Sequence, residues 1–222
     1  MRLFRRPSEP NRFGFLLTGL VLFMTVLPVL SGLGRITHAL LTEFSLTLLL
    51  LAAVWSLTGN RHLFRLGLLL VAATVAATLA YLVRPLPVLV QGVELLSLLF
   101  LLLSSGIAFR AVFAEGEVDL NRLAGAASLY LLMALVWALL YSLLHSFDPA
   151  ALSGLPAPAQ AELWDYLYFS FVTLTTLGYG DVLPVSAEAR TLAMAEAVVA
   201  QFYLTILVAV LVGMLVANRS NR

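Results

Sequence analysis

Residues 163–181 read LWDYLYFSFVTLTTLGYGD, and the predicted fold is built around this stretch. Its first part, Leu163 to Thr175, is apolar and aromatic but only about 13 residues long, whereas a helix needs about 20 to cross a membrane. Helix signals fit this part, because Glu162 and Asp165 lie where the positive end of a helix dipole favours carboxylates. Two glycines separated by one residue follow. The stretch therefore predicts a half-length helix that ends in a turn.

The composition around this stretch excludes a soluble globular fold. Of the 222 residues, 61% are apolar and only 11% are charged, against roughly 25% charged residues in a soluble domain. The mean hydropathy is +0.99, and apolar runs extend along nearly the whole chain. One core cannot bury this surplus, so lipid must surround most of it. The composition predicts an integral membrane protein.

Charge and residue usage exclude several classes of function. The net charge is only +1 and no basic stripe is present, so no nucleic-acid partner is expected. The chain has no cysteine, which removes disulfides, thiolate metal sites and thiol catalysis. His38, His62 and His145 lie far apart, and no paired His, Asp or Ser constellation appears. The sequence predicts neither an enzyme nor a bound cofactor.

Six apolar segments are long enough to span a membrane. The predicted fold class is therefore an all-α membrane protein with six transmembrane helices and one re-entrant helix. The segments are Phe13 to Leu33, Ala39 to Leu57, Leu63 to Val83, Leu86 to Phe109, Leu123 to Leu144, and Thr191 to Ala217.

Arginines orient these spans. An even number of spans places both termini on one side, and of the 13 basic residues only Arg35, Arg84 and Arg190 fall on the other side. Because basic residues concentrate in cytoplasmic loops, both termini are expected to be cytoplasmic. The expected location is the plasma membrane, most naturally the inner membrane of a prokaryote.

A half-length helix that turns back within the membrane forms a re-entrant loop. Non-helical backbone at membrane depth is tolerated where it is buried in protein or lines a water-filled path. The loop between the fifth and sixth spans therefore predicts a pore, and the chain holds one such loop. In the alternative interpretation the Gly-Tyr-Gly turn merely closes a loop, which the short aromatic helix and the two flanking spans disfavour.

The string TTLGYGD at residues 175–181 resembles the selectivity filter of potassium channels, whose usual form is Thr-Val-Gly-Tyr-Gly. The resemblance to that pore domain covers roughly residues 123–217, and the preceding helices match the six-helix layout in number only. It implies potassium ions as the permeant ligand. Because one chain offers one loop, encircling an ion takes four chains, so a homotetramer in membrane lipid is expected.

Backbone carbonyls suit this task, because they replace the hydration shell of an ion without a charge that would trap it. Lining them along one axis requires alternate residues at positive φ, which Gly178 and Gly180 adopt at little steric cost. The predicted potassium ligands are the carbonyls of Thr176, Leu177, Gly178 and Tyr179, together with the Thr176 hydroxyl.

The predicted supports of this filter are Thr175, Gly180, Asp181, Tyr168 and Glu196. Many relatives have two tryptophans where this chain has Tyr168 and Phe169. Tyr168 can donate a hydrogen bond to Asp181, whereas Phe169 cannot donate to Tyr179. We therefore expect a looser support that rearranges at low potassium, and stable currents in millimolar potassium would contradict this expectation.

Two glutamates lie inside predicted spans, where an ionisable residue is costly. Glu196 is expected to be a protonated acid bonded to Ser170 or Thr173 on the short helix. Glu94 is expected to pair with a residue such as His38 or Arg84, or to face a water-filled crevice.

Gating signals are sparse. The span from Leu86 to Phe109 contains no arginine, so conduction is expected to depend weakly on voltage. Ala200 stands where many relatives have a hinge glycine, which favours a gate nearer the cytoplasmic end or in the filter.

Polar breaks divide the chain into expected domains. These are a cytoplasmic segment at 1–12, a four-helix sensor-like domain without a charge ladder at 13–109, a cytoplasmic linker at 110–122, the pore domain at 123–217 and a short tail at 218–222. No cytoplasmic regulatory domain is expected. The alternatives left open are a weakly selective cation channel, a subunit of a potassium uptake transporter and a non-conducting scaffold.

Overall fold

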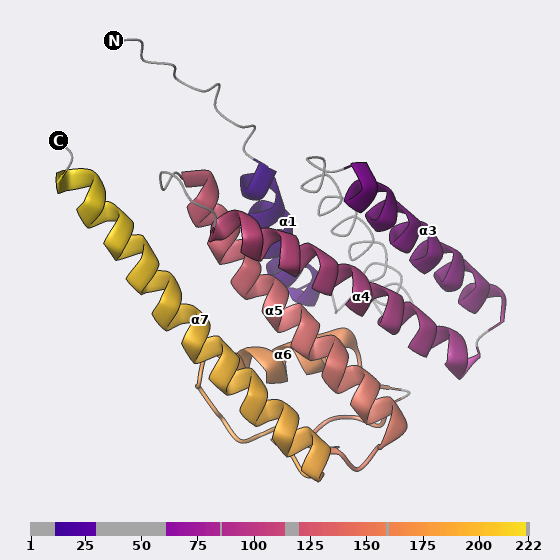
Figure 1. Cartoon of the computed structure of the whole chain (residues 1–222). Helices are drawn as coiled ribbons and strands as arrows, with labels where there is room; N and C mark the ends of the chain where they lie inside the picture. Colours follow the sequence, from indigo (N-terminus) through magenta and orange to yellow (C-terminus); the bar gives the residue numbers. More distant parts are fainter. Residues whose placement is uncertain (1–11, 30–60, 85, 114–119, 159, 221–222) are drawn as a thin grey trace.

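A computed structural model describes residues 12–29, 61–84, 86–113, 120–158 and 160–220. The described residues form helices and one two-stranded sheet (Figure 1). The elements are α1 (Arg12–Val29), α3 (Arg61–Val83), α4 (Pro87–Val112), α5 (Leu120–Phe147), β1 (Leu152–Ser153), α6 (Leu163–Leu174), β2 (Leu183–Pro184) and α7 (Ala187–Ser220). The all-α class predicted from the sequence is confirmed.

Four of the described helices, α3, α4, α5 and α7, are long and apolar enough to cross a membrane. The apolar part of α1, Phe13–Thr25, is shorter than a full span. The predicted span from Ala39 to Leu57 lies outside the described residues. A multi-pass membrane protein is therefore confirmed, while the number of six spans stays a prediction.

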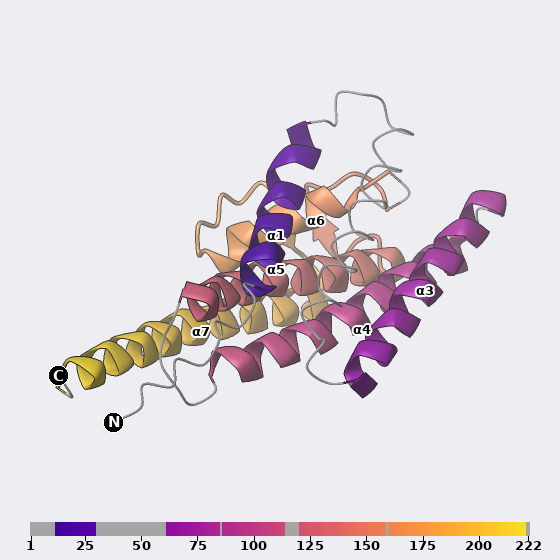
Figure 2. The ribbon, with the colours of Figure 1, turned by 90° about the horizontal axis from the view of Figure 1, so that it is seen from above.

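The helix α5 lies at the centre of the fold. It packs against α1, α4, α6 and α7, and α3 packs on the far side of α4. Viewed from above, α1 and α6 lie on one side of α5, while α4 and α7 lie on the other (Figure 2). The short helix α6 packs mainly against α5 and also contacts α7.

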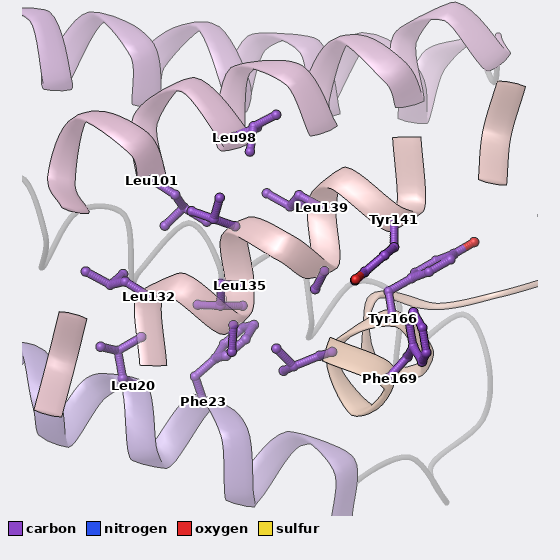
Figure 3. Close-up of a cluster of buried hydrophobic side chains, with 14 of the residues drawn as sticks. Leu20, Phe23, Leu98, Leu101, Leu132, Leu135, Leu139, Tyr141, Tyr166 and Phe169 are labelled. Carbon is purple, nitrogen blue, oxygen red and sulfur yellow. The ribbon is translucent and has the colours of Figure 1, made fainter. Parts of the chain in front are cut away.

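Buried apolar side chains fill the space around α5 (Figure 3). Leu98 and Leu101 reach it from α4, while Leu20 and Phe23 reach it from α1. At one end of this cluster Phe169 of α6 packs edge-on against Tyr141 of α5, with ring centroids 4.7 Å apart. This packing fixes α6, and with it the loop that follows.

Helices α4 and α5 extend further than the sequence predicted. Part of the expected linker at 110–122 is helical, because α4 continues to Val112 and α5 begins at Leu120. The reason lies in tertiary contacts: Val112 is buried, and the side-chain oxygen Oδ1 of Asn121 accepts a hydrogen bond of 3.1 Å from the Phe13 amide. That amide is one of the free donors at the start of α1.

Candidate functional site

The short helix α6 is capped at its start by its own side chains. The Glu162 amide donates to Asp165 Oδ2 over 2.8 Å, and the Glu162 side chain accepts from the backbone of Asp165. This reciprocal capping box satisfies two donors that a helix start leaves free. The sequence predicted that these two carboxylates lie at the start of a helix, and the structure shows the hydrogen bonds that they make there.

At its other end α6 runs directly into the glycine-containing loop. The amides of Leu177 and Gly178 both donate to the Val172 carbonyl, over 2.9 and 3.2 Å. The Thr175 hydroxyl donates to the Phe171 carbonyl over 2.6 Å. These bonds reverse the chain at the end of the half-length helix, as the sequence predicted.

The backbone of this loop alternates in handedness. Thr176, Gly178 and Gly180 have φ angles of +59°, +58° and +80°. Positive φ thus recurs at every second residue, which is the alternation needed to line carbonyls along one axis. A Cβ atom added at Gly178 or Gly180 would meet nothing within 4 Å, so glycine is required there for its φ angle rather than for space.

Thr176 extends the alternation by one step that the sequence analysis missed. A β-branched residue at positive φ is a genuine outlier, because its Cβ lies too close to the neighbouring backbone. Among the described residues, Thr176 is the one non-glycine residue with positive φ. Such strain clusters at functional sites. The two-residue spacing of the glycines, continued backwards, was the signal that pointed to it.

The exit of the loop is tied to α6 through Asp181. The Tyr168 hydroxyl donates to Asp181 Oδ2 over 2.5 Å, and the Val182 amide donates to Oδ1 over 3.1 Å. The hydrogen bond from Tyr168 holds the pKa of Asp181 below its ordinary value, and the same bond raises the pKa of Tyr168 to about 12. The contact predicted between these two residues is confirmed.

The segment before α6 braces the same exit. Strand β1 pairs antiparallel with β2, with Leu152 opposite Pro184. Gly154 follows β1 with φ +86°, and a Cβ at this position would overlap the Asp181 carbonyl oxygen. Gly154 therefore allows a close approach that no other residue permits. This close approach was not predicted from the sequence, although Ser153-Gly154 is a turn signal.

Comparisons with known proteins agree with this geometry. Residues 129–217, which include the C-terminal part of α5, α6, the alternating loop and most of α7, match a family model described as "Ion channel". The chain is also 36% identical over 92 residues to "Protein LctB" of Bacillus caldotenax, an alignment that covers 40% of this chain and 68% of that protein.

The chain belongs to the ion channel family. This membership makes the protein a membrane channel rather than an enzyme, as the sequence predicted. No solved structure gives a significant match.

A buried glutamate joins three helices of the channel. Glu196 of α7 has no exposed surface. Its Oε2 accepts a hydrogen bond of 2.6 Å from the Tyr141 hydroxyl of α5, and its Oε1 lies 2.5 Å from the Ser170 hydroxyl of α6. The predicted contact with Ser170 is confirmed, and Tyr141 is the partner that the sequence analysis missed.

The hydrogen bonds of Ser170 indicate a proton on Glu196. The Ser170 oxygen also lies 3.0 Å from the Ala134 carbonyl, which only accepts. Because a hydroxyl carries one proton, both contacts are hydrogen bonds only when the carboxyl donates to Ser170 and Ser170 donates to Ala134. The geometry thus favours the protonated acid expected from the sequence.

Glu94 has a different partner from those expected. Its Oε1 lies 2.5 Å from the Ser142 hydroxyl of α5, because α4 packs on α5 and turns this side chain towards it. Arg84 is exposed just beyond the end of α3, and His38 lies outside the described residues. The predicted pairing of Glu94 with Arg84 is therefore replaced by a bond to Ser142.

No cluster of three or more His, Asp or Glu side chains that would suit a metal ion occurs in the part of the channel that the structure describes.

The Tyr168→Phe variant is expected to raise the pKa of Asp181 towards its ordinary value of 3.8, because the main cause of the lowered pKa is removed. Because the pKa of Asp181 is lowered in the folded channel, the contact with Tyr168 stabilises the loop at pH values above the ordinary pKa of aspartate. That stabilisation is lost as the pH falls through the lowered pKa. The carboxyl carbon shift of Asp181, followed by NMR against pH, measures this change.

Tyr81→Phe, on an exposed part of α3, is the matched control and should leave Asp181 unchanged. An Asp181 titration that is the same in Tyr168→Phe and in the wild type would contradict the assigned cause.

Proposed function

We propose that this channel conducts potassium selectively and passively through a tetrameric pore. The observation that carries the proposal is the alternation of positive φ at Thr176, Gly178 and Gly180 within the string TTLGYGD. Helices α6, α5 and α7 with the loop between them form the pore-lining unit. Four copies would place four loops around one axis.

The proposed selectivity for potassium is supported by the kind of oxygen atom that the loop provides. The carbonyls of Thr176, Leu177, Gly178 and Tyr179, with the Thr176 hydroxyl, form the proposed ion sites. These oxygens are neutral, so they match the cost of removing water without trapping the ion. Leu177 stands where valine is commoner, which changes the bulk behind the filter but not its carbonyl.

The proposed tetramer is supported by large side chains of the loop that a single chain leaves exposed. The side chains of Leu177 and Tyr179 are 54% and 66% exposed, although both follow directly on a well-packed helix. Large apolar side chains at the tip of a re-entrant loop are covered when neighbouring loops meet. The C-terminus of α6, with about half a negative charge, would then face a shared cavity from four sides and favour a cation there.

The proposal also includes the orientation of the channel in the membrane and the control of its opening. Arginine placement supports cytoplasmic termini and a plasma-membrane location, with Asp181 on the extracellular side of the filter. Arg110 is the basic residue of α4 and lies in its last turn, so voltage sensing by this helix should be weak. Control then rests on the filter, the other helices, lipid or a partner.

The test is ion flux through the purified full-length protein in liposomes. We expect rubidium uptake that barium blocks. In mixed potassium and sodium, the reversal potential should give a permeability ratio of at least about 10, which corresponds to about 1.4 kcal/mol. Native mass measurement should give four chains.

A reversal potential that does not distinguish potassium from sodium would establish the alternative of a weakly selective cation channel. An assembly of other than four chains, or the absence of rubidium flux, would overturn the proposed pore. Substrate accumulation against a gradient would instead indicate an uptake transporter.

A further inference from the structure

The last turn of α6 takes a hydrogen bond from another helix. A helix leaves the carbonyls of its last four residues without partners inside the helix. In α6 the carbonyls of Phe171, Val172 and Thr173 accept hydrogen bonds from amides of the loop that follows. The carbonyl of the fourth residue, Leu174, accepts a hydrogen bond of 3.3 Å from the Tyr130 hydroxyl of α5. Tyr130 therefore completes the hydrogen bonding at the end of α6.

This bond lies next to the strained part of the loop. Leu174 is the last residue of α6, and Thr176 with φ +59° follows two residues later. A β-branched residue keeps such a conformation only where the surrounding structure imposes it. The Thr176 amide donates to the Thr173 carbonyl, and the Tyr130 hydroxyl binds the next peptide group along the chain. The point at which the helix ends and the alternation of positive φ begins is thus fixed partly by α5.

The position of Tyr130 depends in turn on α7. The ring of Tyr203 on α7 lies nearly parallel to that of Tyr130, with centroids 6.1 Å apart and planes inclined by 22°. The Tyr203 hydroxyl donates to the Ala126 carbonyl over 2.7 Å, and Ala126 lies one helical turn before Tyr130. Tyr203 is buried in this arrangement. The ring and the hydroxyl of Tyr203 therefore both contact the part of α5 that carries Tyr130.

The bond from Tyr130 to Leu174 is sensitive to this contact. Bonds between a hydroxyl and a carbonyl usually measure about 2.5 to 3.0 Å, whereas this one measures 3.3 Å. A small displacement of Tyr130 towards Leu174 strengthens the bond, and a small displacement away breaks it. Because Tyr203 packs on Tyr130, the place of Tyr203 on α7 influences this distance.

We propose that Tyr130 is a positioning residue for the ion site at Thr176, and that Tyr203 couples this site to α7. The proposal rests on the proposed potassium conduction, in which the Thr176 oxygens are ion ligands. Tyr130 acts through Leu174 and not on the ion itself. A shift of α7 at Tyr203 is therefore expected to change the affinity of the site for its ion.

The first test follows the backbone of Thr176 by solid-state NMR on the full-length protein in lipid. Thr175-Thr176 is the single pair of consecutive threonines in the chain, so threonine labelling alone identifies the Thr176 signals. Its Cα and Cβ shifts report the backbone φ. In Tyr130→Phe, which keeps the ring and removes the hydroxyl, these shifts should move towards those of an ordinary threonine.

Variants of Tyr203 test the coupling to α7. Tyr203→Ala removes the ring that packs on Tyr130 and should also shift the Thr176 signals, although Tyr203 lies on another helix. Tyr203→Phe keeps the ring and should leave these signals close to the wild type. If alanine prevents assembly, Tyr203→Leu serves the same purpose, because it keeps part of the bulk.

Thr176 shifts in Tyr130→Phe that equal those of the wild type would overturn the positioning role. Unchanged shifts in an assembled Tyr203→Ala or Tyr203→Leu channel would overturn the coupling to α7. This readout needs no ion flux, so its failure is separate from a failure of the proposed potassium conduction.

The second test measures rubidium uptake into liposomes at a series of rubidium concentrations. Tyr130→Phe should raise the half-saturating concentration about fivefold, which corresponds to about 1 kcal/mol, as expected when one hydrogen bond is lost. A variant that only reduces the number of folded channels lowers the maximal rate and leaves the half-saturating concentration unchanged. Tyr81→Phe, on an exposed part of α3, is the matched control and should behave as the wild type does.

An unchanged half-saturating concentration in Tyr130→Phe would overturn the positioning role. A lower one would also overturn it, because it would show that the hydroxyl only weakens the negative end of the α6 dipole. Absence of uptake by the wild type would count against the conduction proposal instead, while the Thr176 shifts would still decide the role of Tyr130.

Discussion

Replacing Gly178 by alanine is expected to abolish rubidium uptake. Gly178 has φ +58° with open space around the missing Cβ, so the added methyl meets no neighbour but strains the backbone. A left-handed conformation costs an L-residue about 1 to 2 kcal/mol, which amounts to roughly 4 to 8 kcal/mol over four loops. The loop is expected to relax out of its alternating conformation. Uptake by the variant in liposomes, compared with that of the wild type, measures the loss.

Gly106→Ala is the matched control. Gly106 lies within α4, and a Cβ there also meets nothing within 4 Å, but the backbone is helical. Alanine in a helix is more stable than glycine by about 0.5 to 1 kcal/mol, so this variant should conduct normally. Normal selective uptake by Gly178→Ala would show that the alternation at this residue is not what conducts the ion.

Replacing Glu196 by leucine should destabilise the assembled channel. The leucine keeps the volume but leaves the Tyr141 hydroxyl, which now donates to Glu196 over 2.6 Å, buried without an acceptor. An unsatisfied buried group costs about 1 to 3 kcal/mol, or roughly 4 to 12 kcal/mol in a tetramer. The temperature at which the oligomer dissociates, followed by size-exclusion chromatography after heating, should fall clearly.

Glu196→Gln tests the same residue with its hydrogen bonds retained. The amide oxygen can accept from Tyr141, while the amide NH2 can donate to Ser170, as the protonated acid does. Stability and potassium selectivity should therefore stay close to the wild type. A loss of potassium preference in Glu196→Gln with an intact oligomer would show that the carboxyl acts on the ion rather than as a link between helices.

Contacts that are close in sequence could be predicted well. The capping residues Glu162 and Asp165 and the bond from Tyr168 to Asp181 depend on short spacings within one helix and the loop that follows. The contact of Ser170 with Glu196 was also within reach, because a buried carboxyl needs a partner and the preceding pore helix offered few. In each case a polar group in an apolar segment needs a hydrogen-bond partner, and few polar residues were placed to provide one.

Contacts between distant helices could not be predicted. The sequence did not mark Tyr141 as a partner of Glu196, and it predicted for Glu94 a pairing with Arg84 or His38, or a water-filled crevice. A membrane helix is apolar all round, so it lacks the stripe that tells a soluble helix which face to bury. Its rotation about its own axis is decided by packing against neighbouring helices, which the sequence pattern does not record.

The amino-acid sequence alone determined that this protein is an all-α membrane protein with a re-entrant loop, because hydropathy and segment length follow directly from the thickness of a bilayer. It also determined where glycine was needed in the loop. The tertiary structure was needed to show that Thr176 shares the left-handed backbone, that Gly154 lies against Asp181, and that Glu94 of α4 is bonded to Ser142 of α5. The physical reason is that these features depend on contacts between segments that are distant in the sequence. Those contacts form only when the other helices pack against α5.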